Sequence, residues 1–370
     1  MKVSLCVPTF ERPATTRILI ESFLAQDHGD RELCIADDSR SDAIERLVST
    51  YNDDRIVYCH QKEPLGFCGN LRSCLERSTG EVIVILGDDD LLARTDSLSI
   101  YAAIFASHPD IGFAHANVVQ IDEGGNVTFV YSSARESMIF DKGAPALEHL
   151  LLSSVHIAGI AFQRLPDLMD LYPSDDMLFP QVKLAAEVLT THGGMAIGAF
   201  LTAARMHADQ LGFTLMQKSK TGSKIAPDNS KAPGDLARSP VTPRHGNAEV
   251  MELVDSLVVQ GIIQPAIART IRIQYRNSYA TNMINEKIIL GNRTMMEHFE
   301  LLRQHNQEAR RSPWLAMLCA VVLVLPRRAA LQAKLTARTL IARRMLSNYD
   351  ASRDWPLVGA MQQRQAGQLS

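Results

Sequence analysis

Short apolar runs alternate with stretches of helical periodicity over the first 120 residues. The apolar runs predict strands, and the stretches between them carry apolar residues three or four positions apart, the period of a half-buried helix. The four predicted strands are Lys2–Val7, Glu32–Ala36, Ile56–Cys59 and Glu81–Leu86. Because strands and helices alternate, the pattern favours a doubly wound α/β domain built on a parallel sheet.

Turn and cap residues punctuate the predicted helices. Pro13 suits the first turn of a helix, where its missing N–H is not needed. Asp42 followed by Glu45 resembles a capping box at the start of the second helix, and Gly80 is placed to end the third, predicted at Asn70–Ser78. The run VIVIL before Gly87 has no polar interruption, which is typical of a central strand covered on both faces.

The pattern changes after the first half of the chain. Further strands and helices are predicted to about Leu211, among them a helix over Ser97–Ser107 and strands over Ile111–Ile121 and Val127–Tyr131. Residues rich in Lys, Ser, Gly and Pro then predict a linker. The expected organisation is a Rossmann-like domain at 1–215, a flexible linker at 216–248, a helical region at 249–312, an apolar plus basic segment at 313–350 and a disordered tail at 351–370.

An apolar segment near the C-terminus is flanked by basic residues. Pro313 and Pro326 bracket twelve residues, WLAMLCAVVLVL, whereas a membrane-spanning helix needs roughly 20. No acidic residue occurs from Ala309 to Tyr349. This combination favours attachment to an anionic membrane surface. The alternative is a buried helix beside a solvated basic helix.

Composition narrows the class of protein. Of the 370 residues, 46% are hydrophobic and 21% are charged, and the net charge is −3. These values exclude wholesale disorder, a polytopic membrane protein and a nucleic-acid binder that works by bulk basicity. The six cysteines form no C-x-x-C pair, and the first residues do not resemble a signal peptide, so we expect reduced thiols and a cytoplasmic location.

Polar and mostly acidic residues follow three of the predicted strands. They are 8–11 (PTFE), 37–39 (DDS) and 88–90 (DDD). Ligands of such sheets bind outside the carboxyl ends of the strands. The sequence therefore predicts a binding site along this edge.

The consecutive carboxylates Asp88, Asp89 and Asp90 point to a cation. Side by side they repel one another, and a hard divalent ion such as Mg²⁺ or Mn²⁺ relieves the repulsion while taking further ligands from water and phosphates. The alternative is a solvated acidic turn ahead of the helix near Ser97. The cation hypothesis would fail if these side chains pointed away from any cleft or were held in ion pairs with arginine.

Three segments together resemble family 2 glycosyltransferases. They are VSLCVPTFERP, LCIADDSRSD and STGEVIVILGDDDLL, in that order and spacing, and the resemblance covers roughly residues 3–210. It implies an A-type, Rossmann-like nucleotide-sugar fold. It also implies metal-dependent, inverting transfer of a sugar from a nucleoside-diphosphate sugar to a saccharide hydroxyl.

The resemblance assigns roles around the donor. It places Pro8, Thr9 and Glu11 against the nucleoside and Asp38 where a carboxylate accepts a hydrogen bond from the base. The remaining donor-binding candidates are Gly66, Asn70 and Asp88. The family often has Ala-Arg-Asn in the segment where this chain has Gly-Asn-Leu-Arg at 69–72.

The family's Asp-x-Asp metal motif fits this chain in two registers. One pairs Asp88 with Asp90; the other puts Gly87 at the first acidic position and leaves Asp89 as the main ligand. His207 falls where family members often carry a histidine that meets the metal or the diphosphate, and it is equally compatible with a surface histidine.

An inverting transferase needs a general base to take the acceptor proton. In the family this is an aspartate about 90 residues after the metal motif. Asp176, with Asp175 in reserve, matches that position. The alternative role for both is to favour the positive end of a helix opened by Ser174.

The acceptor is expected to be lipid-linked, because the C-terminal segment suits the inner face of the cell membrane. By analogy with the family, the reaction would belong to surface polysaccharide, O-antigen or capsule assembly. Two rival interpretations stay open: a nucleotidyltransferase acting on sugar phosphates, and a catalytically silent membrane-bound scaffold. Against the first, this chain has no Gly-rich phosphate loop after the first predicted strand.

Overall fold

The computed structural model describes most of the chain, namely residues 1–122, 124–131, 134–174, 177–205, 246–289, 291–326, 328–333, 336, 346, 347, 349–358 and 360. The chain divides into two compact units, Met1–Arg205 with Ala342–Ser370, and Met206–Ile341. Asp175, Asp176 and His207 lie outside the described residues, as does most of the linker predicted at 216–248.

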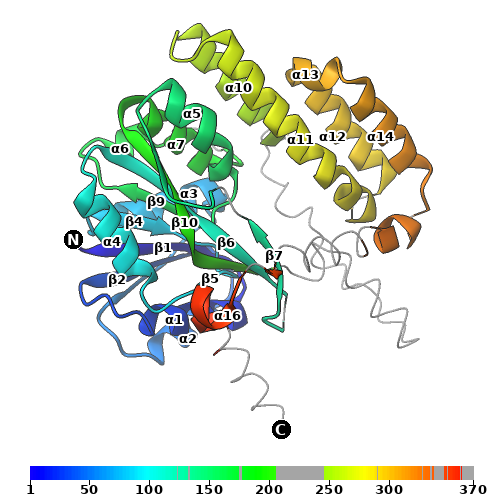
Figure 1. The fold of residues 1–370 in the computed structure, drawn as a ribbon. Helices are drawn as coiled ribbons and strands as arrows, with labels where there is room; N and C mark the ends of the chain where they lie inside the picture. Colours follow the sequence, from blue (N-terminus) through cyan, green and yellow to red (C-terminus); the bar gives the residue numbers. More distant parts are fainter. Residues whose placement is uncertain are drawn as a thin grey trace, which may run out of the picture. The chain divides into compact units, whose positions relative to one another are not determined.

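The first unit is a mixed α/β domain (Figure 1). Its elements are β1 (Val3–Thr9), α1 (Pro13–Leu24), β2 (Arg31–Asp37), α2 (Ala43–Ser49), β3 (Ile56–His60), α3 (Gly66–Arg77), β4 (Val82–Ile85), β5 (Leu91–Leu92), α4 (Ser97–Ser107), β6 (Ile111–Ile121), β7 (Val127–Tyr131), β8 (Met138–Phe140), α5 (Ala144–Leu150), the 3₁₀ helix η1 (Leu151–Val155), β9 (Ile160–Gln163), α6 (Leu168–Leu171), α7 (Pro180–Thr191), β10 (Gly193–Arg205) and α16 (Ala351–Asp354).

The second unit is helical in its described part. Its helices are α10 (Gly246–Val259), α11 (Pro265–Ile289), α12 (Asn292–His305), α13 (Gln307–Arg310) and α14 (Pro313–Val324). Among the helices that the structure describes, none has the length and apolar character needed to cross a membrane.

The described strands form one sheet in the order β3-β2-β1-β4-β9-β6-β10-β5, with β7 beside β6 and β8 beside β10. Strands β3, β2, β1 and β4 run parallel, as the alternating pattern predicts. Strand β9 then enters antiparallel to both β4 and β6, so the sheet is mixed rather than purely parallel. The fold is therefore Rossmann-like at one end and departs from that pattern at the other.

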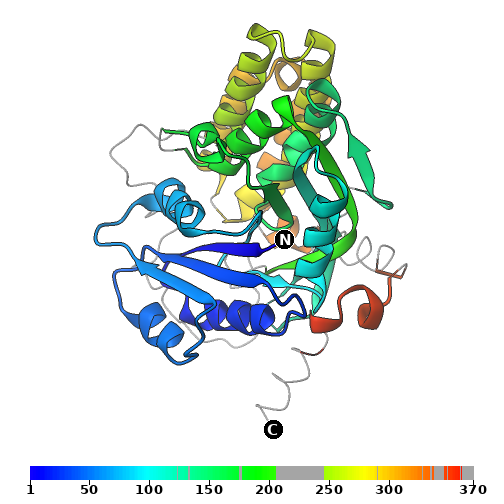
Figure 2. The ribbon, with the colours of Figure 1, turned by 90° about the vertical axis from the view of Figure 1, so that its left-hand side faces the viewer.

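Helices cover both faces of the sheet. Apolar side chains of α1, α2 and α4 pack with Val3, Leu5 and Val7 on one face. Helix α3 lies on the other face, where the Cys6 thiol donates to the Cys74 carbonyl (3.8 Å). Figure 2 shows α1 and α3 on opposite sides of β1. Every residue of β4 is buried, which explains why its sequence carries no polar interruption.

Most elements predicted for residues 1–131 are confirmed, and the helix over Ser97–Ser107 and the strands Ile111–Ile121 and Val127–Tyr131 have the predicted bounds. The capping box predicted at Asp42 is wrong. No side chain caps α2, and the Asp42 carboxylate instead accepts a hydrogen bond from Arg46 (2.9 Å) one turn later. An arginine one turn away competes for the same carboxylate.

The segment after the helical unit packs onto the α/β domain. The Trp355 ring meets the Phe200 ring edge-on (centroids 5.3 Å apart), and Tyr349 contacts Phe200 from another side (4.9 Å). The Leu357 amide donates to the carbonyl of Ala93 (3.1 Å), directly after β5. Within 351–370, where a disordered tail is expected, Trp355 and Val358 belong to this core, and residues 361–370 lie outside the described part.

We expect Trp355→Ala to lower the free energy of unfolding by about 3 kcal/mol or more, because the ring is almost fully buried and its loss leaves a cavity. The matched control is Trp314→Ala, at the chain's other tryptophan, which is 49% exposed. Urea denaturation followed by circular dichroism measures both. Equal losses for the two variants would contradict the packing role of Trp355.

Candidate functional site

The carboxyl ends of β1, β2 and β4 bring the candidate residues to one edge of the sheet. Thr9 pairs with Asp37 at the ends of β1 and β2, and Cys6 pairs with Ile85 near the end of β4. The acidic loop 88–90 follows β4 directly. Parallel strands thus place segments that are about 30 and 80 residues apart in the sequence side by side, as the sheet pattern predicts.

Asp88 joins the acidic loop to the end of β1. Its Oδ2 accepts hydrogen bonds from the Thr9 hydroxyl and the Phe10 amide, each 3.0 Å long. Burial and the neighbouring Asp89 carboxylate raise the pKa of Asp88 above its ordinary value, and the positive charge of Arg12 opposes the rise. A positive charge near this carboxylate therefore favours its ionised form.

Arg12 provides that positive charge, and the sequence analysis did not single it out. Its Nη1 lies 3.0 Å from Asp88 Oδ1 and 3.0 Å from Asp89 Oδ2. The signal that could have found it is its position, three residues after β1 on the edge that carries the carboxylates. Its side chain is 45% exposed, whereas those of Asp88 and Asp89 are 8% and 15% exposed.

The contacts of Arg12 bear on the cation hypothesis. That hypothesis names arginine ion pairs with the acidic loop as an observation against it, and two such pairs are present. The same contacts show that one oxygen of Asp88 and one of Asp89 face a shared positive group. A divalent cation could take the place of the Arg12 guanidinium, since hard cations prefer carboxylate oxygens as ligands.

Asp90 has a different task from its neighbours. Its Oδ2 accepts from the Gly87 amide (3.3 Å) and its Oδ1 from the Arg205 amide at the end of β10 (3.1 Å). Burial, followed by the repulsion of Asp89, raises the pKa of Asp90 well above its usual range. With both oxygens bonded to backbone, this side chain closes its own loop and ties it to β10.

Asp38, Gly66 and Asn70 lie together between β1, β2 and the start of α3. The Asp38 oxygens accept from the amides of Leu65 (2.7 Å) and Gly66 (2.9 Å), which fixes the first turn of α3. Gly66 has a φ of +68°, a conformation that L side chains rarely adopt. Asn70 donates to the Ala36 carbonyl at 2.9 Å and so holds α3 against β2.

Glu11 holds the loop that follows β2. Its Oε1 accepts from the Arg40 amide (2.8 Å) and its Oε2 from the Ser41 hydroxyl (2.8 Å). Pro8 lies within β1, opposite Ala36. The described candidates thus all lie along one edge, and most of their polar atoms shape the loops around it.

The candidate base cannot be placed by the structure, because Asp175 and Asp176 lie outside the described residues. The helix expected to open near Ser174 is α7, which begins at Pro180, and its N-cap residue Phe179 makes no side-chain cap. His207, two residues past the end of β10, is likewise outside the described part.

The described residues contain no group of three or more His, Cys, Asp or Glu side chains arranged to hold a metal ion. Mg²⁺ and Mn²⁺ in sugar-nucleotide chemistry need less than that, since one or two carboxylates suffice when phosphates and water complete the shell. Asp88 and Asp89, each with one oxygen against the same cationic group, fit this requirement.

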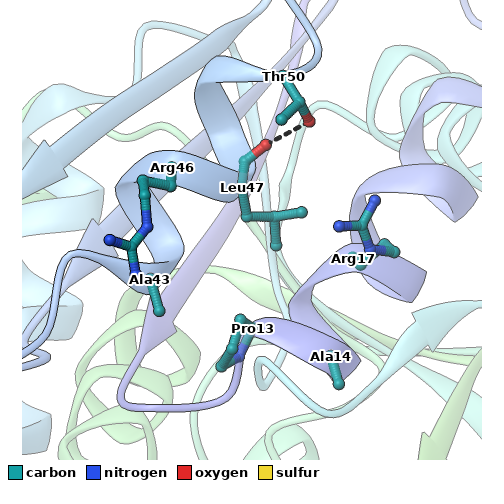
Figure 3. A pocket seen from close by; sticks show the side chains of 7 residues that line it. All are labelled: Pro13, Ala14, Arg17, Ala43, Arg46, Leu47 and Thr50. Carbon is teal, nitrogen blue, oxygen red and sulfur yellow. Dashed lines mark hydrogen bonds between the residues drawn. The ribbon is translucent and has the colours of Figure 1, made fainter.

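A pocket of about 470 Å³ lies elsewhere, between α1 and α2 (Figure 3). Its lining residues are Pro13, Ala14, Arg17, Ala43, Arg46, Leu47 and Thr50. The described candidate residues do not line this pocket, and it lacks acidic groups among its lining side chains. We attach no donor role to it.

The sequence is similar to those of bacterial sugar transferases. A relative from Campylobacter jejuni subsp. jejuni, GalNAc(5)-diNAcBac-PP-undecaprenol beta-1,3-glucosyltransferase, is 33% identical over 135 residues, which cover 35% of this chain and 42% of the relative. The Escherichia coli UDP-Glc:alpha-D-GlcNAc-diphosphoundecaprenol beta-1,3-glucosyltransferase is 29% identical over 89 residues, covering 24% and 35% respectively. The match spans less than half the length of each relative.

Solved structures share the fold. The crystal structure of TarS 1–349 from S. aureus, determined with UDP-GlcNAc, superposes with a TM-score of 0.56 at 13% identity, over 93% of this chain and 92% of that one. The family model "Glycosyl transferase family 2" matches residues 4–164, which include β1, β2, β4 and the acidic loop. Residues 4–164 of this chain therefore match the model of glycosyl transferase family 2, a family of sugar-transferring enzymes.

Proposed function

We propose that the protein is a metal-dependent, inverting glycosyltransferase. It moves a sugar from a nucleoside-diphosphate sugar to a hydroxyl of a saccharide acceptor. The observation that carries the proposal is the family match over residues 4–164, because this segment includes the edge of the sheet where Asp88 and Asp89 lie. Charge of both signs at the carboxyl ends of parallel strands suits a diphosphate and its counter-ion.

The donor-binding rim consists of Pro8, Thr9, Glu11, Asp38, Gly66, Asn70 and Asp88. In support, Glu11 orders the loop after β2, and Asp38 orders the start of α3, through backbone hydrogen bonds. A carboxylate oxygen has two lone pairs, so an oxygen that accepts from an amide can accept again from a nucleoside. Preformed loops bind a donor without an ordering cost.

Asp88 and Asp89 would hold a Mg²⁺ or Mn²⁺ ion, with Asp89 as the main ligand. The Asp89 side chain is 15% exposed and that of Asp88 only 8%. We place Asp90 behind Asp89 as a ligand because both Asp90 oxygens already accept backbone hydrogen bonds, whereas Asp89 Oδ2 lies against the Arg12 side chain. This favours the register that aligns Gly87 with the first acidic position. Such an ion, when bound, stabilises negative charge on the diphosphate leaving group as a Lewis acid.

Transfer is a single displacement. The acceptor oxygen attacks the anomeric carbon as the bond to the nucleoside diphosphate breaks on the opposite face, which inverts the anomeric configuration. Asp176 takes the acceptor proton, with Asp175 as the reserve base, and His207 meets the metal or the diphosphate. Arg12 supplies further positive charge beside the leaving group, since it already lies against Asp88 and Asp89.

The acceptor is a lipid-linked saccharide in surface polysaccharide, O-antigen or capsule assembly. Support comes from the two relatives, whose names specify undecaprenyl diphosphate-linked glycans. A lipid-linked acceptor also accounts for the segment after Ala309, which carries no acidic residue up to Tyr349. On this proposal the enzyme works at the inner face of the cell membrane, attached from the cytoplasm.

Asp89→Asn should weaken Mn²⁺-dependent binding of the donor by about tenfold or more, because it removes the charge that attracts the cation. Thermal-shift titrations with UDP-, GDP- and dTDP-sugars, with and without Mn²⁺, measure the effect. Asp90→Asn should lower the melting temperature without donor, because the single amide oxygen of asparagine can accept only one of the Gly87 and Arg205 N–H groups.

The exposed Asp54→Asn change is the matched control and should alter neither quantity. If Asp90→Asn abolished the metal response while Asp89→Asn retained it, the register that pairs Asp88 with Asp90 would replace the one proposed. If the unaltered protein neither bound nor hydrolysed any donor with Mn²⁺ or Mg²⁺, the chain would be a silent scaffold.

Asp176→Asn should leave donor binding unchanged and slow transfer about 100-fold or more, because the acceptor hydroxyl then keeps its proton. Single-turnover transfer to an undecaprenyl diphosphate-linked sugar measures the rate. Asp175→Asn is the paired variant and should reduce the transfer rate far less. Normal transfer by Asp176→Asn with intact donor binding would refute its role as base.

A further inference from the structure

Helix α14 (Pro313–Val324) leaves a continuous apolar stripe uncovered. Four large apolar side chains lie three or four positions apart and so share one face of the helix. They are 49%, 61%, 48% and 80% exposed, in the order Trp314, Met317, Val321 and Val324. We call these four residues the α14 stripe. Ala316 and Ala320 of the same helix are also exposed and apolar.

The opposite face of α14 is packed within the helical unit. Leu315, Cys319 and Val322 are buried there, and the Cys319 thiol contacts the Met296 sulfur at 3.6 Å. Each helix end is fixed as well. The Ser312 hydroxyl accepts from the Leu315 amide (3.2 Å), and the Lys287 ammonium donates to the Leu323 carbonyl (2.8 Å) and to that of Val322.

This anchoring means that the stripe cannot turn inward. A helix that is apolar on every side normally lies inside a core, yet half of α14 faces solvent. Contiguous apolar surface of this kind on a folded unit marks an interaction site. The stripe therefore calls for an occupant that accepts apolar side chains.

Charge on either side of the helix selects the occupant. Arg310 and Arg311 precede α14 and Arg328 follows it, and all three are exposed. The twelve residues of α14 extend about 18 Å, well short of a hydrocarbon core of about 30 Å. An apolar face with cationic ends, too short to span, matches the interfacial plane of an anionic bilayer, where Trp also prefers to lie.

We propose that the α14 stripe inserts into the surface of an anionic lipid bilayer, with α14 parallel to the membrane plane and the flanking arginines on lipid phosphates. The inference deepens the proposed function, on which it rests for its purpose, by naming the surface that brings the enzyme to a lipid-linked acceptor. The docking face itself is argued from the exposure, anchoring and charge of α14 alone.

Co-sedimentation of the full chain with vesicles tests the proposal. The vesicles contain either phosphatidylcholine alone or phosphatidylcholine with 30% phosphatidylglycerol. Met317→Glu with Val321→Glu should reduce binding to the anionic vesicles by about tenfold or more, because charge replaces two apolar side chains on the inserting face. Val259→Glu, at an 87% exposed position on α10, is the matched control and should bind like the unaltered chain.

The arginines provide an independent readout. Arg310→Gln with Arg311→Gln should weaken binding to anionic vesicles by about fivefold per charge and should make the remaining binding less sensitive to salt. Circular dichroism and melting temperature confirm that each variant is folded.

Three results would overturn the proposal. They are equal binding of the stripe variant and the Val259 control, equal binding to neutral and anionic vesicles, and a lipid-free dimer in sedimentation velocity that the stripe variant dissolves. The third would assign the stripe to a second copy of this chain. Donor thermal shifts on the same samples separate the two proposals, since vesicle binding without donor binding refutes only the function and the reverse refutes only the docking face.

Discussion

Carboxylates crowded at one end of a parallel sheet need positive partners, and this requirement organises the α/β domain. Burial raises the pKa of Asp88 and Asp90, and nearby hydrogen-bond donors and cations oppose the rise. Backbone amides oppose it at Asp90, and Arg12 opposes it at Asp88. The loops at this edge take the shapes that bring those donors within reach.

The acidic side chains of the edge thereby divide into two groups. The carboxylates of Asp38, Glu11 and Asp90 accept hydrogen bonds from backbone amides of their own or neighbouring segments. These bonds stabilise the conformation of the loops. One oxygen of Asp88 and one of Asp89 instead contact the partly exposed side chain of Arg12. On the proposed function, a divalent cation takes the place of this arginine, whereas the backbone amides keep their carboxylates.

In the helical unit, helix α14 is buried on one face and carries exposed apolar side chains on the other. Lys287 and Ser312 fix the ends of α14 by hydrogen bonds, and its inner face is packed. The outer face exposes apolar side chains to water, which is unfavourable, and no packing within the described part of the helical unit offsets this. By contrast, Trp355 is buried against Phe200. The two tryptophans of the chain therefore differ in environment, since Trp314 is exposed.

Local pattern alone determined much of this protein. The strands and helices of residues 1–131, the shared edge after β1, β2 and β4, and the acidic loop at 88–90 all follow from periodicity and strand order, because neighbouring residues set them. Tertiary structure decided the rest: the antiparallel entry of β9, the pairing of Arg12 with Asp88, and which face of α14 is covered. Those outcomes depend on contacts between residues distant in sequence, for which the sequence carries no periodic signal.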